Sequence, residues 1–217
     1  MKQYVMGNGA IALGALSAGV RLVAGYPGTP SSEIIETVSK YPHEGVHLEW
    51  SVNEKAALEV AVAAAYSGAR AMVTMKQMGL NVASDPLMSV AYIGVKGGLV
   101  IVSADDPGPI SSQTEQDTRR YADFCRIPVF DPASPEEAYQ MIQDAFAYSE
   151  KYNTPVLFRP TTRVCHAYAA IETPESFTPG TCEGFERDTG RWVIFPRLSY
   201  INHGKIEKRN VEIGKDF

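Results

Sequence analysis

Cysteine is scarce in this 217-residue sequence, and long apolar segments are missing. The three cysteines, Cys125, Cys165 and Cys182, are widely spaced, which excludes both a disulfide framework and a CxxC metal or cluster site. No apolar run approaches the roughly 18 residues of a membrane span. Residues 1–9 lack the apolar core of a signal peptide. We therefore expect a cytoplasmic protein that does not associate with membranes.

Basic patches are also absent, and the formal net charge is −5, so we expect no nucleic-acid partner. Hydrophobic residues make up 45% of the chain and charged residues 21%, which is ordinary for a globular protein. At this length the chain predicts one domain, or one domain with an extension.

Several catalytic motifs are missing as well. The sequence contains neither the GxxxxGK[ST] of P-loop NTPases nor the GxSxG of α/β-hydrolases, and residues 7–12 lack the third glycine of GxGxxG. His43 and His47 flank a loop without a cysteine at ligand spacing, which favours ordinary surface histidines over a metal site. Asp105-Asp106 precedes Pro-Gly-Pro, so a turn is favoured over a divalent-cation site. We expect no metal ligands in this chain.

What is present is a regular alternation of strand and helix patterns with short connections. This alternation predicts a doubly wound α/β domain with a mostly parallel sheet, over residues 1–170. Residues 171–217 lose the periodicity, and we expect an irregular extension or linker there, with one strand at 192–195. The expected strands are 21–26, 46–50, 70–75, 98–103, 128–130 and 156–158, and the expected helices are 7–19, 30–40, 54–66, 79–93 with a kink at Pro86, 113–124 and 135–151.

The most distinctive stretch is the predicted helix that follows Trp50. Asn53 suits the N-cap position, and Glu54 in the first turn suits the positive end of the helix dipole. Positions 56–65 are almost all Ala, Val or Leu, with Glu59 as the exception. A helix that is apolar on all sides is normally buried, in a core or a subunit interface. Glu54 is therefore expected at the mouth of a buried helix, and an ordinary first-turn charge in solvent is the alternative that the residues alone leave open.

Ligands of open α/β sheets collect at the carboxyl ends of the strands. Four polar connections are expected at that edge, at residues 26–32, 51–54, 76–81 and 105–114. In the first of them Thr29 is expected to cap a helix that begins at Pro30. The residues 76–81 are expected to form a turn.

Two of these stretches carry a resemblance. Gly25-Tyr-Pro-Gly-Thr-Pro-Ser-Ser-Glu-Ile34 together with Glu49-Trp-Ser-Val-Asn-Glu-Lys-Ala-Ala57 resembles the α subunits of indolepyruvate:ferredoxin oxidoreductases, within the thiamine-diphosphate-dependent 2-oxoacid:ferredoxin oxidoreductases. Residues 76–87 and 112–119 are similar to further stretches of the same subunits. The resemblance covers residues 1–200 approximately and implies a pyrimidine-binding domain of a thiamine enzyme.

The resemblance implies roles for particular residues. Glu54 matches the glutamate that contacts N1′ of the aminopyrimidine, where a partly desolvated carboxylate can share a proton. The turn Tyr26, Pro27, Gly28 and Thr29 is implied to contact the cofactor, and Thr29 also the substrate carboxylate.

Residues 76–81 occupy the place of the Gly-Pro-Gly-x-x-Asn turn of many thiamine enzymes. Asn81 fits that pattern, whereas Lys76 and Gln77 replace its glycine and proline. Asn81 and Gln77 are therefore expected at the cofactor, and Lys76 and Gln77 at the substrate carboxylate, with an ordinary surface turn as the alternative.

The sequence departs from the resembled subunits in two ways. It has no Gly-Asp-Gly motif for Mg²⁺ and diphosphate, and no cysteine runs for [4Fe–4S] clusters. The resemblance places both in the remainder of a longer subunit, and a naturally split subunit is the alternative. It further implies a diphosphate-binding domain or subunit, a β subunit, ferredoxin, coenzyme A and a 2-oxoacid as partners, and a homodimer.

Three functions stay open at this point. The first is the pyrimidine-binding half of an oxidoreductase that decarboxylates aryl 2-oxoacids to acyl-CoA. The second is the α chain of a split decarboxylase of the phosphonopyruvate or sulfopyruvate type. The third is a non-catalytic assembly module.

Overall fold

The computed structural model describes residues 1–42 and 44–216. Within these residues, six strands pair in parallel in the order β3-β2-β4-β5-β7-β6. This confirms the doubly wound α/β class. The strands of this sheet are β2 (Leu22–Gly25), β3 (His47–Trp50), β4 (Ala71–Lys76), β5 (Leu99–Ala104), β6 (Val129–Phe130) and β7 (Val156–Phe158).

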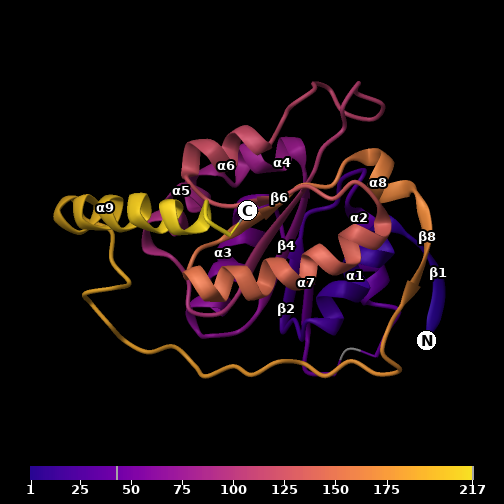
Figure 1. Ribbon diagram of the computed structural model, residues 1–217, viewed down its shortest axis with the longest axis horizontal. Coiled ribbons are helices and arrows are strands. Elements are labelled where there is room, and N and C mark those ends of the chain that lie inside the picture. The colour runs from indigo at the N-terminus through magenta and orange to yellow at the C-terminus, as the bar shows by residue number, and fades with distance from the viewer. Residues whose placement is uncertain (43, 217) are drawn as a thin grey trace.

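Helices cover both faces of the sheet (Figure 1). On β5, Leu99 and Ile101 pack into the core beneath α3, α4, α5 and α6, whereas Val100 and Val102 pack into the core beneath α1, α2 and α7. This alternation follows from the two-residue period of a strand that is buried on both faces. The helices are α1 (Gly7–Ser17), α2 (Ser32–Val38), α3 (Glu54–Tyr66), α4 (Gln77–Val82), α5 (Ser84–Ile93), α6 (Arg119–Cys125), α7 (Pro135–Tyr152), α8 (Thr162–His166) and α9 (Pro196–Ile213).

The direction of the chain changes between β2 and β4. After β2 the chain moves outward to β3, and after β4 it moves the other way to β5. Such a switch point leaves a crevice at the carboxyl ends of the two strands, where ligands of open α/β sheets bind. Gly25 at the end of β2 pairs with Trp50 on one side and with Thr74 on the other.

A small second sheet was not expected from the sequence. Strand β1 (Lys2–Met6) pairs antiparallel with β8 (Tyr168–Glu172), and Val5 packs with Ala169 and Ile171. Strand β8 therefore crosses the expected division at residues 170 and 171. Both strands are short and lie far apart in the sequence, so neither has a local pattern that reveals its partner.

The extension contains a helix where none was expected, and the expected strand at 192–195 is wrong. Helix α9 begins after Phe195 with Pro196 in its first turn, and Ile206 and Ile213, seven residues apart, are buried on one side. Residues 173–195 run along the amino edge of the sheet (Figure 1). There the Gly180 N–H donates to Gly19 O at 2.8 Å, and the Gly184 N–H to Ser67 O at 3.0 Å.

Two further helix predictions require correction. The helix expected at 113–124 is only α6, because residues 105–118 are a loop held by tertiary hydrogen bonds. The helix expected at 79–93 with a kink at Pro86 is two helices, α4 and α5, which meet at Ala83, and Pro86 lies in the first turn of α5. Among the described residues, no helix has the length and hydropathy that crossing a bilayer requires.

Candidate functional site

Helix α3 places Glu54 at its first position. Asn53 caps the helix, as predicted, with its side-chain oxygen accepting a hydrogen bond from the Ala56 N–H at 2.9 Å. Glu54 is only 9% exposed. Among the described residues its carboxylate has no hydrogen-bond or ion-pair partner. Because no described protein group bonds it, the Glu54 carboxylate is free to accept a hydrogen bond from a ligand.

The turn after β2 lies beside this helix. Tyr26, Pro27 and Thr29 are exposed and Gly28 is half-buried. The Ser31 hydroxyl donates to Gly28 O at 2.9 Å, and the Gly28 N–H donates to Ser32 Oγ at 2.8 Å. These bonds fix the turn internally and leave the Thr29 hydroxyl available to a ligand.

The prediction that Thr29 caps α2 is wrong. The helix begins at Ser32, and Ser31 occupies the cap position without a side-chain cap bond. The start of the helix is instead bound by Asn8 in α1, whose amide donates to Pro30 O at 2.7 Å and to Glu33 Oε2 at 2.9 Å. Sequence reasoning missed Asn8, because its partners lie more than twenty positions away.

Lys76 ends β4 on the opposite side of the crevice. Its stem lies against Gly28, where an added Cβ would be 3.1 Å from both Cγ and Cδ of Lys76. Lys76 is half-buried, and its ammonium group has no partner among the described residues. The structure thus brings Lys76 to the Tyr26–Thr29 turn, as a cation with no counter-ion.

Gln77 is placed differently from the sequence-based expectation. The residues after Lys76 form α4 and not a turn, and Gln77 at its first position is fully buried. Its side-chain Nε2 donates to Thr114 O at 2.5 Å, and its Oε1 accepts from the Asp106 N–H at 2.7 Å. The amide therefore binds the 105–118 loop at both ends, which supports a structural role in place of a ligand contact.

Asn81 is exposed on α4, and its side chain faces α6. Its Oδ1 accepts a hydrogen bond from the Tyr121 hydroxyl at 2.5 Å. The residue of α4 that contacts Glu54 is Gly79, where an added Cβ would lie 2.6 Å from the carboxylate oxygen. The structure therefore brings together Glu54 and Gly79, but not Glu54 and Asn81.

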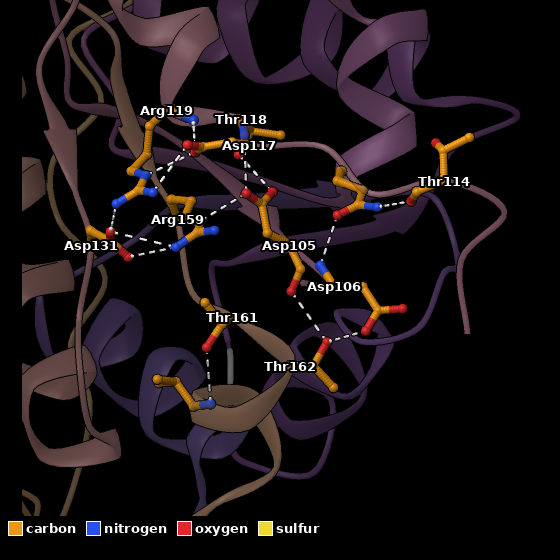
Figure 2. Close-up of polar contacts among 12 residues, drawn as sticks. Asp105, Asp106, Thr114, Asp117, Thr118, Arg119, Asp131, Arg159, Thr161 and Thr162 are labelled. Atoms are coloured by element: carbon orange, nitrogen blue, oxygen red, sulfur yellow. Dashed lines mark hydrogen bonds and ion pairs between the residues drawn. The ribbon is translucent and has the colours of Figure 1, made fainter. Parts of the chain in front are cut away.

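A second group of polar residues lies at the carboxyl ends of β5, β6 and β7, where it forms a hydrogen-bonded network (Figure 2). Asp105, at the end of β5, is fully buried and accepts from the Thr118 N–H at 3.0 Å and hydroxyl at 2.7 Å. Arg159 Nε donates to the same carboxylate at 2.7 Å, and its guanidinium also contacts Asp131 at 3.3 Å. Burial raises the pKa of Asp105, against the lowering by Thr118 and Arg159. Asp105 thereby closes the 105–118 loop at its two ends.

Asp106 has its own set of donors. One carboxylate oxygen accepts from the N–H groups of Ile110, Ser111 and Ser112 at 2.8–3.1 Å, and the other from the Thr162 hydroxyl at 2.8 Å. Burial acts to raise the pKa of Asp106, but these hydrogen bonds outweigh it and hold that pKa below its usual value. Protein donors thus account for both aspartates, which agrees with the preferred turn interpretation.

The histidine and cysteine singled out by the sequence and described by the structure, His47 and Cys125, have no role at this edge. His43 lies outside the described residues, and His47 is exposed and contacts Glu49 at 2.8 Å. Burial raises the pKa of the Cys125 thiol to about 11, which makes it a poor nucleophile.

A comparison with known families shows which family this chain belongs to. Residues 13–186 match the model of the thiamine-diphosphate-binding domain of pyruvate flavodoxin/ferredoxin oxidoreductases. The chain belongs to this family. The resemblance found in the sequence is therefore confirmed, and the thiamine-diphosphate-binding domain occupies most of the chain.

Curated relatives agree with this assignment. The chain is 50% identical to indolepyruvate oxidoreductase subunit IorA of Methanothermobacter marburgensis, over 95% of this chain and 34% of that protein. It is 43% identical to the subunit of the same name from Methanothermobacter thermautotrophicus, over 98% and 34%. It is 30% identical to 2-oxoglutarate synthase subunit KorA of the latter organism, over 79% and 48%. The chain thus spans about a third of the length of the indolepyruvate relatives.

A solved structure has the same fold. The chain superposes on a 2-oxoglutarate:ferredoxin oxidoreductase from Magnetococcus marinus with a TM-score of 0.80 and 18% identity. The superposition covers all of this chain and 46% of that one. At this identity the likeness concerns the fold alone.

The residues at the crevice suit the pyrimidine ring of thiamine diphosphate. The ring offers a nitrogen that can share a proton, and Glu54 offers a nearly buried carboxylate without a partner. Gly28 leaves room for the Lys76 stem, and Gly79 leaves room for the Glu54 side chain. The chemistry of the donor set therefore fits this domain's cofactor.

Proposed function

We propose that this chain is the pyrimidine-binding half of a thiamine-dependent oxidoreductase that oxidatively decarboxylates aryl 2-oxoacids of the indolepyruvate type to acyl-CoA. The observation that carries the proposal is the carboxylate of Glu54, which is 9% exposed and lacks a partner at the switch-point crevice. The names of the indolepyruvate relatives support the substrate class.

When bound, thiamine diphosphate supplies a carbon nucleophile and an electron sink for breaking the bond between the keto carbon and the carboxylate. The contribution of Glu54 is to hold and share a proton at N1′ of the pyrimidine. Contact with Gly79 keeps water from one side of Glu54.

The other polar groups of the crevice suit the 2-oxoacid. The Lys76 ammonium has no counter-ion among the described residues, so it is available to the substrate carboxylate. Thr29 is exposed on the same turn as Gly28, which lies against the Lys76 stem, and we assign its hydroxyl to the same carboxylate. Tyr26 and Pro27 supply apolar surface at the cofactor. Gln77 and Asn81 are assigned to the support of α4 and not to ligand contact.

The remaining functions belong to other domains or subunits in this proposal. A diphosphate-binding domain supplies Mg²⁺, and [4Fe–4S] clusters lie in the rest of the full-length enzyme, which passes electrons to ferredoxin. Coenzyme A and a β subunit complete the reaction, and the assembly is a homodimer. The apolar outer face of α3, with Val60 half-buried and Ala63 exposed, offers a surface to the partner domain.

The alternatives are less well supported. Every relative named above is called an oxidoreductase or synthase subunit, which favours an oxidoreductase over a split decarboxylase. A non-catalytic assembly module gives no reason for a carboxylate that lies at the switch point without a protein partner among the described residues.

The direct test replaces Glu54 by Gln and by Ala in the full-length protein. We expect turnover with indolepyruvate to fall at least tenfold, which corresponds to about 1.4 kcal/mol in the barrier. The control is Glu36→Gln, the same change at an exposed position of α2, which leaves turnover unchanged. Unchanged turnover in both Glu54 variants would refute the proposal and leave the assembly module.

A further inference from the structure

Gly79 lies directly against the Glu54 side chain. The three atoms nearest to a Cβ built on Gly79 all belong to Glu54: Cγ and Oε1 at 2.6 Å and Cδ at 2.9 Å. The φ angle of Gly79 lies outside the left-handed region that favours glycine. Alanine is the better residue inside a helix, so the sequence of α4 by itself would favour alanine here.

Other buried glycines show a different kind of constraint. A Cβ on Gly7 would lie 1.9 Å from Val164 O, and one on Gly97 would lie 2.3 Å from Ala69 O. In those two places a side chain collides with backbone, which cannot move without disturbing the fold. At Gly79 it collides with the far end of one side chain, which can rotate away.

We propose that Gly79 is a positioning residue whose missing side chain creates the space in which the Glu54 carboxylate lies. Because Glu54 has no hydrogen-bond partner among the described residues, packing against Gly79 is the contact that sets the direction of its carboxylate. A methyl group at position 79 turns the carboxylate out of the crevice while the fold stays intact. This inference rests on the proposed function of Glu54.

The position of Gly79 is in turn fixed by the sheet edge. Gln77, two residues earlier, anchors α4 to the 105–118 loop through Asp106 and Thr114. The Gly79 carbonyl accepts from the Ala83 N–H at 3.0 Å, at the junction of α4 and α5. With Gln77 anchoring the start of α4, an added methyl group at Gly79 is relieved by movement of the Glu54 side chain.

The test is Gly79→Ala in the full-length protein, measured as kcat and KM for indolepyruvate and as melting temperature without cofactor. We expect kcat to fall at least tenfold and KM to change less than threefold, because the substrate groups Lys76 and Thr29 are untouched. The control is Gly204→Ala in the middle of α9, where a Cβ meets nothing within 4 Å, and it leaves kcat unchanged.

A double-mutant cycle on melting temperature distinguishes positioning from a general structural effect. In a Glu54→Ala background the methyl group at position 79 has free space, so Gly79→Ala raises the melting temperature, as Gly204→Ala does. In the wild-type background the same change gives a smaller rise or a fall. Equal effects in both backgrounds would overturn the proposal, since the two residues would then not be coupled.

The two proposals fail separately. If Glu54→Gln abolishes turnover and Gly79→Ala does not reduce kcat, the role of Gly79 is refuted and that of Glu54 stands. If Glu54→Gln leaves turnover unchanged, the proposed function itself is refuted. A crystal structure of the Gly79→Ala variant is expected to show the Glu54 carboxylate rotated away from α4, and an unmoved carboxylate would contradict the inference.

Discussion

Glu54 and Asp105 are acidic residues at the carboxyl edge of the same parallel sheet, and their surroundings are opposite. Asp105 is fully buried, and its carboxylate binds Thr118 and Arg159. Glu54 is nearly as buried and has no such partner among the described residues. Burial alone therefore does not distinguish structural acids from functional ones. The distinguishing feature is whether protein donors already satisfy the carboxylate.

The surroundings of β5, β6 and β7 differ from those of β2, β3 and β4 in how many of their charged groups are paired. Around β5, β6 and β7, the charges alternate from Asp117 through Arg119 and Asp131 to Arg159 and Asp105 (Figure 2). Around β2, β3 and β4, Lys76 and Glu54 have no partner among the described residues, although Glu49 on β3 bonds His47 and Ser51. These charged groups around β5, β6 and β7 are therefore paired, whereas two of those around β2, β3 and β4 have no partner in the described part of the chain.

The largest expected effect on stability comes from breaking the hydrogen-bonded network around Asp105. Asp105→Asn leaves the buried Arg159 charge without its main partner, so we expect the free energy of unfolding to fall by about 3–5 kcal/mol. Chemical denaturation of wild type and variant measures this. The matched control is Glu212→Gln in the exposed ion pair with Lys215, expected to cost less than about 1 kcal/mol. Similar losses in both variants would show that the network has no special role.

A smaller loss of stability is expected from changing Gln77, which joins α4 to the 105–118 loop. Gln77→Ala leaves the Asp106 N–H and the Thr114 carbonyl without their partner, and each unsatisfied buried group costs about 1–3 kcal/mol. Denaturation should therefore show a clear loss, whereas Gln140→Ala on the exposed face of α7 should have almost no effect. If Gln77→Ala is as stable as Gln140→Ala, the support that α4 receives from the loop is not real.

The smallest expected effect appears only in acid. The pKa of Asp106 is lowered in the folded chain, so its charged form contributes stability above the unfolded pKa of about 3.9, and this contribution is lost as the pH falls through the lower folded pKa. Asp106→Asn should therefore weaken the dependence of unfolding free energy on pH below about 4. Parallel pH curves for wild type and variant would contradict the assigned hydrogen bonds.

Much of the fold could be predicted because its cause is local. The unbroken apolar run of β5 and the cap and proline at Ser134 and Pro135 define a buried strand and a helix start, and both are confirmed. The elements that were missed depend on distant partners. Strands β1 and β8 pair although they lie far apart in the sequence. The 105–118 loop is not helical because Asp105 and Gln77 bind its backbone.

In the candidate site, too, some features follow from the local sequence and others depend on distant partners. The cap, the carboxylate and the apolar helix that follow one another in the sequence predict the local position of Glu54, and its role at the cofactor is implied only by the family resemblance. The contact between Glu54 and Gly79 could not be predicted, since it depends on how α3 and α4 pack. Gln77 and Asn81 were assigned to ligands from their place in a motif, and the structure gives each a protein partner instead.

The most direct test of the central claim is a crystal structure of the full-length protein with thiamine diphosphate bound. The distance that decides is the one between the Glu54 carboxylate and N1′ of the pyrimidine. We predict a hydrogen bond of about 2.6–3.2 Å. A pyrimidine ring bound elsewhere, with the Glu54 side chain directed into solvent, would contradict the account.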